Sequence, residues 1–387
     1  MERCIGLDMG YGFIKSDDGR EGHVFPSVVG EGSSGAPMAL GFRQPPPTED
    51  LRVTVNGKHY FLGDLAIRHS RIAHRGLSPT RSEGDDLRIL FLGALSMYCR
   101  ETMNNFYVVT GLPPGRMHLA DDLTRQLRGD HEVIRQTGGQ RFGVSIRIDR
   151  IEVVPQPVGT YWSEVLDNRG QLRASNPMLK GRIGIIDIGF RTSDLATIVD
   201  GEYSPAFSRT VPIGISTGYD TISSSLSTEY GLERETYTLD DSIISGSINV
   251  SGQPVDISGL RDQVFEELAT KLLVEVRSQW QLAEYDHILI TGGGGQVLEK
   301  YLRPRMSQAL LVNDPVTANA RGYFAWAYHN TQQAMASEAP AQQPTGQQPQ
   351  TPPPAGSEQQ PVGSSYGNLD QSPGQQSTPY GGGGQER

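Results

Sequence analysis

Short apolar runs alternate with amphipathic segments through most of this sequence. Runs of apolar and β-branched residues bounded by turn-forming residues are typical of buried strands. They predict strands at Cys4 to Leu7, Phe106 to Thr110, Ile151 to Val154, Ala196 to Val199 and His287 to Thr291.

Helical periodicity marks several of the segments between these strands. In Asp86 to Arg100 the apolar positions recur at spacings of three and four, which predicts one buried helix face. Every fourth residue from Leu260 to Trp280 is apolar, which predicts a core-facing helix rather than a cofactor motif. A further helix is predicted to begin near Pro157, and a last one to span Val316 to Tyr328, where Pro315 suits a first turn. Alternating strands and helices indicate the α/β class.

The end of the chain has a different composition. From about Gln332 to Arg387 the residues are mostly Gln, Pro, Gly, Ser and Thr, without Ile, Phe or Trp. Such a segment buries too little apolar surface to offset chain entropy, so we expect a disordered tail. The rest of the 387 residues is long enough for two domains.

Charge and cysteine content narrow the possible partners and compartment. The formal net charge of −10 argues against direct nucleic-acid binding, so a link to DNA would need a second, basic protein. Only Cys4 and Cys99 are present, which fits a reducing compartment and predicts a cytoplasmic protein. We expect no membrane insertion, because no apolar stretch is long enough to span a bilayer and the start lacks the features of a signal peptide.

Two segments of the sequence share one pattern, an apolar strand that ends in Asp-x-Gly. The first is Ile5 to Gly12 and the second is Ile185 to Thr192. The glycine lets the turn approach a ligand with its backbone, and the carboxylate suits a hydrated cation. Either aspartate alone could equally cap a turn, and the glycines of Ile290 to Gly295 could form a flexible loop. The matched pair together with this run favours a nucleotide held between two similar domains.

Five segments resemble the signatures of the actin, Hsp70 and hexokinase superfamily, and they occur in the family's order. The segments are Asp8-Met9-Gly10, Gln156 to Gly159, Asp187 to Thr192, Thr291 to Gly294 and Ala318 to Gly322. The chain most resembles prokaryotic actin-like ATPases of the ParM/StbA type, with similarity to archaeal actin-like proteins, over residues 4 to 328. The resemblance implies an actin-like fold of two duplicated ribonuclease-H-like domains. We expect these domains at 1–155 and 156–330, and the disordered tail at 331–387.

The resemblance also implies roles for individual residues around ATP and Mg²⁺. Asp8 and Asp187 would hold the Mg²⁺, largely through water. Lys15 would neutralise phosphate charge, and Gln156 would orient the attacking water with support from Asp194. Backbone amides would contact the phosphates at Gly10, Tyr11, Gly12, Gly189, Phe190, Arg191 and Thr192. Adenine and ribose would lie against Gly292, Gly293 and Gly294, and Gly214 and Gly218 would close the same pocket.

The fold alone does not choose among the functions that it supports. An Hsp70-like chaperone would need a substrate-binding domain where the tail stands, and a kinase would need a further carboxylate aimed at a substrate hydroxyl. We therefore expect an ATP hydrolase that polymerises into cytoskeletal filaments, for plasmid DNA segregation through an adaptor protein. The nucleotide could also be GTP. The alternatives are a non-polymerising actin-fold scaffold of the pilus or division type, or a small-molecule kinase.

Overall fold

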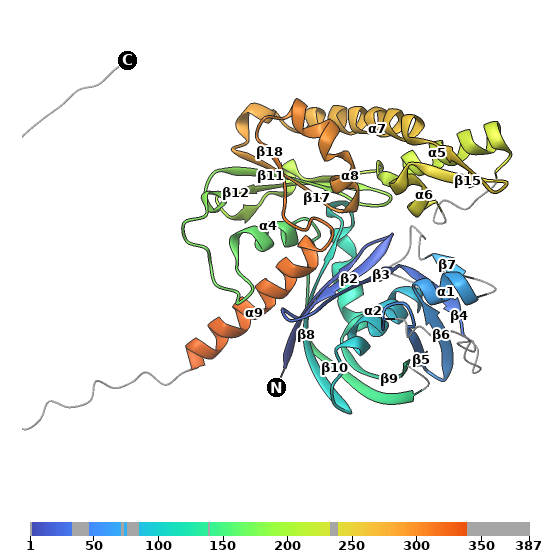
Figure 1. Cartoon of the computed structure of the whole chain (residues 1–387). Helices are drawn as coiled ribbons and strands as arrows, with labels where there is room; N and C mark the ends of the chain where they lie inside the picture. The colour runs from blue at the N-terminus through green and yellow to red at the C-terminus, as the bar shows by residue number, and fades with distance from the viewer. Residues whose placement is uncertain are drawn as a thin grey trace, which may run out of the picture. The chain divides into compact units, whose positions relative to one another are not determined.

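The computed structural model describes residues 2–32, 46–70, 73–75, 85–137, 140–232 and 239–338. Within these ranges strands and helices form an α/β fold with sheets of ten and six strands (Figure 1), as the sequence predicts. None of the described helices combines the length and apolar character that a membrane crossing requires. Residues 339–387, most of the expected tail, lie outside the described part.

The larger sheet is organised around β1 (Arg3–Met9), β8 (Met103–Leu112) and β10 (Gln140–Pro155). These three strands run parallel and end at the same edge of the sheet. On its other side β1 pairs antiparallel with β2 (Phe13–Asp17), which forms a hairpin with β3 (Gly22–Pro26). The sheet continues from β10 through β9 (Gly129–Thr137), β5 (Arg52–Val55), β6 (Lys58–Leu62), β4 (Val28–Glu31) and β7 (Ala73–Arg75).

The smaller sheet repeats the local arrangement around β1. Here β11 (Arg182–Ile188) pairs antiparallel with β12 (Ser193–Val199) and parallel with β17 (His287–Thr291). Each Asp-x-Gly strand therefore has one antiparallel neighbour that follows it and one parallel neighbour on its other side. The remaining strands are β13 (Glu202–Tyr203), β14 (Arg209–Val211) and β18 (Ala309–Leu311), and β15 (Ser247–Val250) pairs with β16 (Gln253–Asp256) in a separate hairpin.

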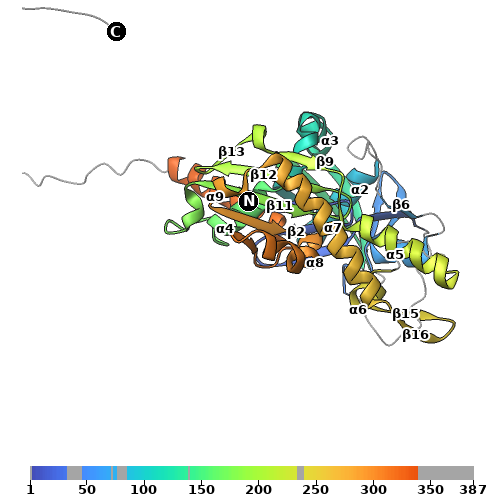
Figure 2. The same cartoon turned by 90° about the horizontal axis from the view of Figure 1, so that it is seen from above.

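Helices cover both sheets with the faces that the sequence predicts. On the larger sheet α2 (Asp85–Met97) buries its apolar side mainly against β9, β10 and β4. On the smaller sheet α7 (Ser258–Gln279) packs beside α5 (Ile215–Tyr230) and α8 (Gly293–Leu302) over one face (Figure 2). The fourth-residue stripe of α7 forms the core there, as its spacing indicates. Three further helices are short: α1 (Asp64–His69), α3 (Ala120–Leu127) and α6 (Asp240–Ser245).

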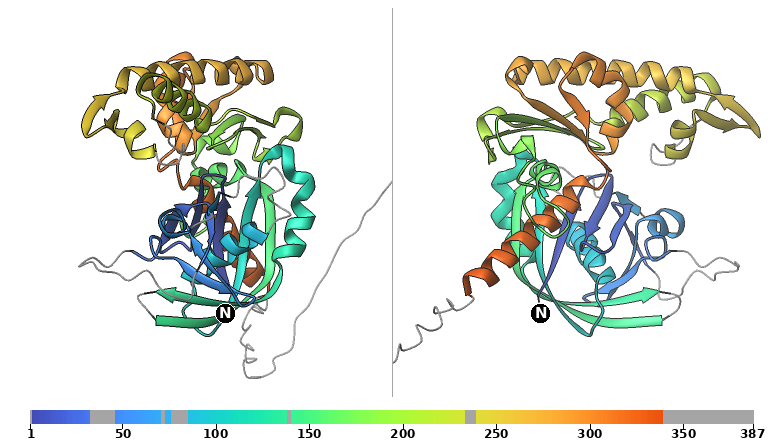
Figure 3. Two further views of the ribbon diagram at one scale, coloured as in Figure 1. Left: turned by 90° about the vertical axis from the view of Figure 1, so that its right-hand side faces the viewer. Right: turned by 60° about the vertical axis from the view of Figure 1, so that its left-hand side comes forward.

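Two helices, α4 (Val158–Val165) and α9 (Ala318–Glu338), cover the opposite face of the smaller sheet. The helix α9, orange-red in Figures 1 and 3, then runs along β1 and β8 of the larger sheet. Glycines allow this close contact, because a Cβ at Gly6 would overlap the α9 backbone and one at Gly322 would overlap the backbone of α4. Helix α9 therefore contacts both the larger and the smaller sheet directly. We call each sheet with the helices that cover it one half of the molecule.

Helix α9 is longer than its sequence pattern predicts. The expected end is Tyr328, whereas the helix continues to Glu338 and includes eight residues, 331–338, that the expected domain bounds assign to the tail. The polar residues after Tyr328 find partners: His329 bonds to the Gly170 carbonyl at 2.7 Å, and Asn330 donates to the Tyr107 hydroxyl at 3.2 Å. These contacts are long-range in sequence, so composition does not reveal them.

Candidate functional site

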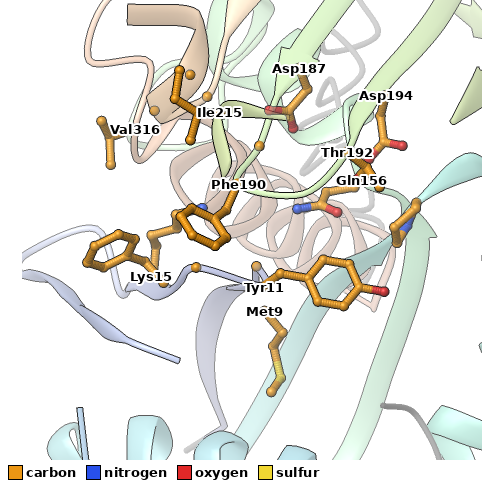
Figure 4. A pocket seen from close by; sticks show the side chains of 18 of the residues that line it. Met9, Tyr11, Lys15, Gln156, Asp187, Phe190, Thr192, Asp194, Ile215 and Val316 are labelled. Atoms are coloured by element: carbon orange, nitrogen blue, oxygen red, sulfur yellow. The ribbon is translucent and has the colours of Figure 1, made fainter. Parts of the chain in front are cut away.

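A cavity of about 630 Å³ opens where the ends of β1 and β11 face each other. Figure 4 shows side chains from both sheets around it, with Met9, Tyr11 and Lys15 from the larger sheet and Asp187 and Asp194 from the smaller one. Of the predicted site residues, those lining it are Gly10, Tyr11, Gly12, Lys15, Gln156, Asp187, Gly189, Phe190, Thr192, Asp194, Gly292, Gly293 and Gly294. Thirteen predicted positions from distant parts of the sequence thus meet at one cavity.

Asp8 lies just behind the cavity wall with both carboxylate oxygens occupied. The register of the β1–β2 pair sets Lys15 directly opposite Asp8, and Lys15 Nζ donates to Asp8 Oδ2 at 2.8 Å. Gln156 Nε2 donates to Asp8 Oδ1 at 2.7 Å. Asp8 is only 2% exposed, so these two partners separate its carboxylate from the cavity.

Asp187 holds the matching position at the end of β11. Asn319 Nδ2, from the start of α9, donates to Asp187 Oδ2 at 2.7 Å. Burial and, to a lesser extent, the negative charge of Asp8 together raise the pKa of Asp187 to about 6. The two aspartates are thus close enough to repel each other, which a cation between them would relieve.

Asp194 lies opposite Asp187 in the register of β11 and β12. Thr210 Oγ1, from β14, donates to Asp194 Oδ1 at 2.6 Å. Burial raises the pKa of Asp194 to about 8, despite this hydrogen bond. The same Thr210 oxygen accepts the backbone N–H of Gly115 at 3.1 Å, so a short hydrogen-bonded chain joins Asp194 to the larger sheet's half.

The turns that follow the two Asp-x-Gly strands touch each other. A Cβ at Gly12 would lie 3.0 Å from the Phe190 Cβ, which is tighter than an ordinary contact, so glycine lets the two turns lie this close. The ring of Tyr11 lies under the Arg116 guanidinium, with 5.7 Å from its central carbon to the ring centroid. Arg191 is exposed and does not line the cavity, unlike its neighbours Phe190 and Thr192.

Gly214 and Gly218 do not line the cavity either. A Cβ at Gly214 would overlap the backbone of Phe190 and Arg191, and the N–H of Ile215 donates to the Gly189 carbonyl at 3.1 Å. Gly218 packs against the Phe265 ring, with 3.0 Å between its would-be Cβ and the nearest ring atom. These glycines bring α5 close to the second turn and to α7, while Ile215 and Tyr219 supply the wall.

The three glycines Gly292 to Gly294, after β17, differ in which atoms a side chain at each position would meet. Gly292 has φ +83°, and a Cβ there would lie 2.5 Å from Asp187 Oδ1. A Cβ at Gly294 would lie 2.5 Å from Ile188 Cγ2. At Gly293 a Cβ would meet nothing within 4 Å, so this position faces open space. Only Gly293 is therefore free of a packing requirement, and it is the position best suited to approach a ligand.

Several residues around the cavity carry no predicted role. Asn319 lies inside a signature segment, so its segment was recognised but its contact with Asp187 was not. Thr210 and Arg116 have no sequence signal, because their contacts depend on how the two halves meet. Further lining residues without a predicted role include Thr110, Asp240, Asp241, Ile244, Gln296 and Val297.

The carboxylates suit one type of metal ion more than others. Among the described residues, no group of three or more His, Cys, Asp or Glu side chains forms an all-protein metal site. Mg²⁺ commonly binds through one or two carboxylates, with water and substrate phosphates as its other ligands. Asp187 lines the cavity and Asp8 lies just behind its wall, so these two buried carboxylates fit that donor set.

Two family models match this chain. The model described as "Actin like proteins N terminal domain" matches residues 6–159, and that described as "Archaeal actin homologue MreB-like, C-terminal" matches residues 185–304. No curated protein sequence matches the chain.

Solved structures share the fold at low sequence identity. A 15-stranded ParM filament from Clostridium botulinum matches with a TM-score of 0.71 at 22% identity, over 84% of this chain and 99% of that chain. The archaeal actin homologue Ta0583 in complex with ADP gives 0.68 at 19% identity, over 84% and 99%. Bacillus thuringiensis ParM with AMPPNP gives 0.65 at 15% identity, over 85% and 99%. These matches confirm the predicted actin-like fold.

Proposed function

Because this chain belongs to the actin-like proteins, we propose that it binds Mg²⁺ and ATP between its two halves, hydrolyses the ATP and assembles into filaments. One observation carries the proposal. Two strands from different sheets end at one cavity. Both carry Asp-x-Gly at that end, and each pairs antiparallel with one neighbour and parallel with the other. The domains of this ATPase would be 1–155 and 156–330, with one Asp-x-Gly strand in each.

The binding roles follow from the contacts around the cavity. Asp8 and Asp187 would hold Mg²⁺, which would neutralise phosphate charge there. Backbone amides of the turns after β1 and β11 would bind the phosphates, and Gly293 would lie against the base and ribose. That solved relatives carry ADP or AMPPNP supports an adenine nucleotide, while GTP remains the competing ligand to compare.

Hydrolysis would depend on positioning and charge rather than on a strong base. Gln156 donates through Nε2 to Asp8, which leaves its Oε1 to accept a hydrogen bond from the attacking water. Lys15 bonds to Asp8 in this structure, and its ammonium would turn to the phosphates when a cation binds at Asp8. Asp194 would support the water from the second half.

Assembly into filaments is the part that rests most on the relatives. The ParM of Clostridium botulinum forms a 15-stranded filament, and the fold that this chain shares with it extends over 99% of that ParM chain. Identical head-to-tail contacts that do not close produce helical filaments. We propose that such filaments position plasmid DNA in the cytoplasm through a basic adaptor protein, since the net charge of −10 disfavours direct DNA binding.

Right-angle light scattering and phosphate release on the full chain test both activities at once. Mg²⁺ with ATP should raise the scattering and release phosphate, whereas ADP or no nucleotide should do neither; a parallel series with GTP ranks the nucleotides. Asp187→Ala should lower phosphate release by about 100-fold or more, because it removes a metal ligand. Asp149→Ala is the control, since Asp149 is an exposed carboxylate in β10 that pairs with Arg147.

Three results would contradict parts of the proposal. Phosphate release without scattering would favour a non-polymerising scaffold. An absence of both, with nucleotide still bound, would favour a kinase that lacks its substrate. Equal activity of wild type and Asp187→Ala would remove Asp187 from the metal site.

A further inference from the structure

Helix α9 presents two polar side chains, one turn apart, toward the candidate site. Asn319 donates to the carboxylate of Asp187, and Tyr323, four residues later, donates its hydroxyl to the Gln156 carbonyl at 2.8 Å. Residues four apart lie on the same side of a helix. One helix therefore contacts both a residue proposed to hold the metal and the residue proposed to orient water.

The ring of Tyr323 occupies a space that two glycines leave for it. Tyr323 is fully buried at 0% exposure. A Cβ at Gly111, at the end of β8, would overlap the hydroxyl, and one at Gly159, in α4, would lie 2.6 Å from Cε1. The hydroxyl consequently has one fixed position and cannot swing away from Gln156.

Gln156 stands between two prolines, Pro155 and Pro157, and this limits how its peptide groups can be held. The peptide group that joins Gln156 to Pro157 has no N–H, so only its carbonyl oxygen can anchor it. That oxygen accepts from the Tyr323 hydroxyl and, at the longer distance of 3.2 Å, from the N–H of Gly159. On the other side, the Gln156 N–H donates to the Leu112 carbonyl at 2.8 Å.

We propose that the Tyr323 hydroxyl is a positioning group that fixes the Gln156 backbone and thereby aims its side-chain amide. This inference rests on the proposed role of Gln156 in ATP hydrolysis. Tyr323 does not line the cavity, so it acts through Gln156 and not on the substrate. A role in packing alone would involve the ring but not the hydroxyl.

The variant Tyr323→Phe separates these two roles, because it keeps the ring and removes the hydroxyl. Loss of one hydrogen bond to a backbone carbonyl should lower kcat by about 3- to 10-fold with KM for ATP unchanged. In a Gln156→Ala background the same change should have no further effect, since the group that it positions is gone. The matched control is Tyr161→Phe, because Tyr161 is also buried and donates to a backbone carbonyl, that of Met178, at 3.2 Å.

Crystal structures of nucleotide-free wild type and Tyr323→Phe supply a readout that does not depend on hydrolysis. We expect the Gln156 side chain to leave Asp8 in the variant and to stay bound in wild type and in Tyr161→Phe. Inactive wild-type protein with a displaced Gln156 in the variant would refute the ATPase proposal but support the positioning role. An unmoved Gln156, or equal losses of kcat with and without the Gln156 side chain, would overturn the inference.

Discussion

The buried carboxyl of Asp194 should make the unliganded protein less stable as the pH rises. Burial raises the pKa of Asp194 to about 8, whereas a solvated aspartate ionises near 3.9. Between these values the unfolded chain is ionised and the folded chain holds the proton. Folding therefore takes up a proton, and the free energy of unfolding falls by up to about 1.4 kcal/mol per pH unit.

Replacement of Asp194 by Asn should remove this pH dependence. The amide cannot ionise, and its oxygen can still accept from Thr210. From pH 6 to pH 7.5 wild type should lose up to about 2 kcal/mol relative to Asp194→Asn, or about 4 °C in Tm for a body of this size. Asp187, whose pKa is raised to about 6, contributes mainly below this window.

Thermal melting in buffer without Mg²⁺ or nucleotide measures the difference. Wild type and Asp194→Asn are compared at several pH values, with Asp149→Asn as the exposed control. The histidines contribute equally to all three proteins, so they cancel in the comparison. Parallel pH dependences of wild type and Asp194→Asn would refute the argument that burial of this carboxyl raises its pKa.

Two further pairs of substitutions test contacts in and beside the cavity. Gly292→Ala should destabilise the protein by about 2 kcal/mol or more in urea unfolding, because φ is +83° and the Cβ would lie 2.5 Å from Asp187 Oδ1. Gly293→Ala should leave the stability unchanged but weaken nucleotide binding, which calorimetry measures. Thr210→Val should speed hydrogen exchange at the Gly115 amide by about 3- to 10-fold through loss of that bond, and Thr210→Ser should restore the slow rate. Equal stabilities of the two alanine variants, or equal exchange in Val and Ser variants, would contradict these contacts.

The sequence predicts central strands of both sheets, because buried parallel strands are apolar runs that stop at glycine turns. The contact between Lys15 and Asp8 was not predicted, since it depends on the register of β1 and β2 that the structure shows. The contacts of Asn319, Thr210 and Tyr323 do not follow, because each depends on how distant elements cross. Composition also misjudges 332–338, which are helical. The helix continues there because the preceding part of α9 is anchored by contacts with β8 and with the Gly170 carbonyl.

The crossing of α4 and α9 also brings together two of the three tryptophans of the chain. Trp162 and Trp326 stack with ring centroids 4.4 Å apart and planes tilted by only 6°. Indole rings this close share their electronic excitation, which gives paired bands of opposite sign in circular dichroism. Since α4 follows Gln156 and α9 carries Asn319, a shift between these helices would change those bands. The stacked pair is thus an intrinsic optical probe of how α4 and α9 lie relative to each other, and it needs no added label.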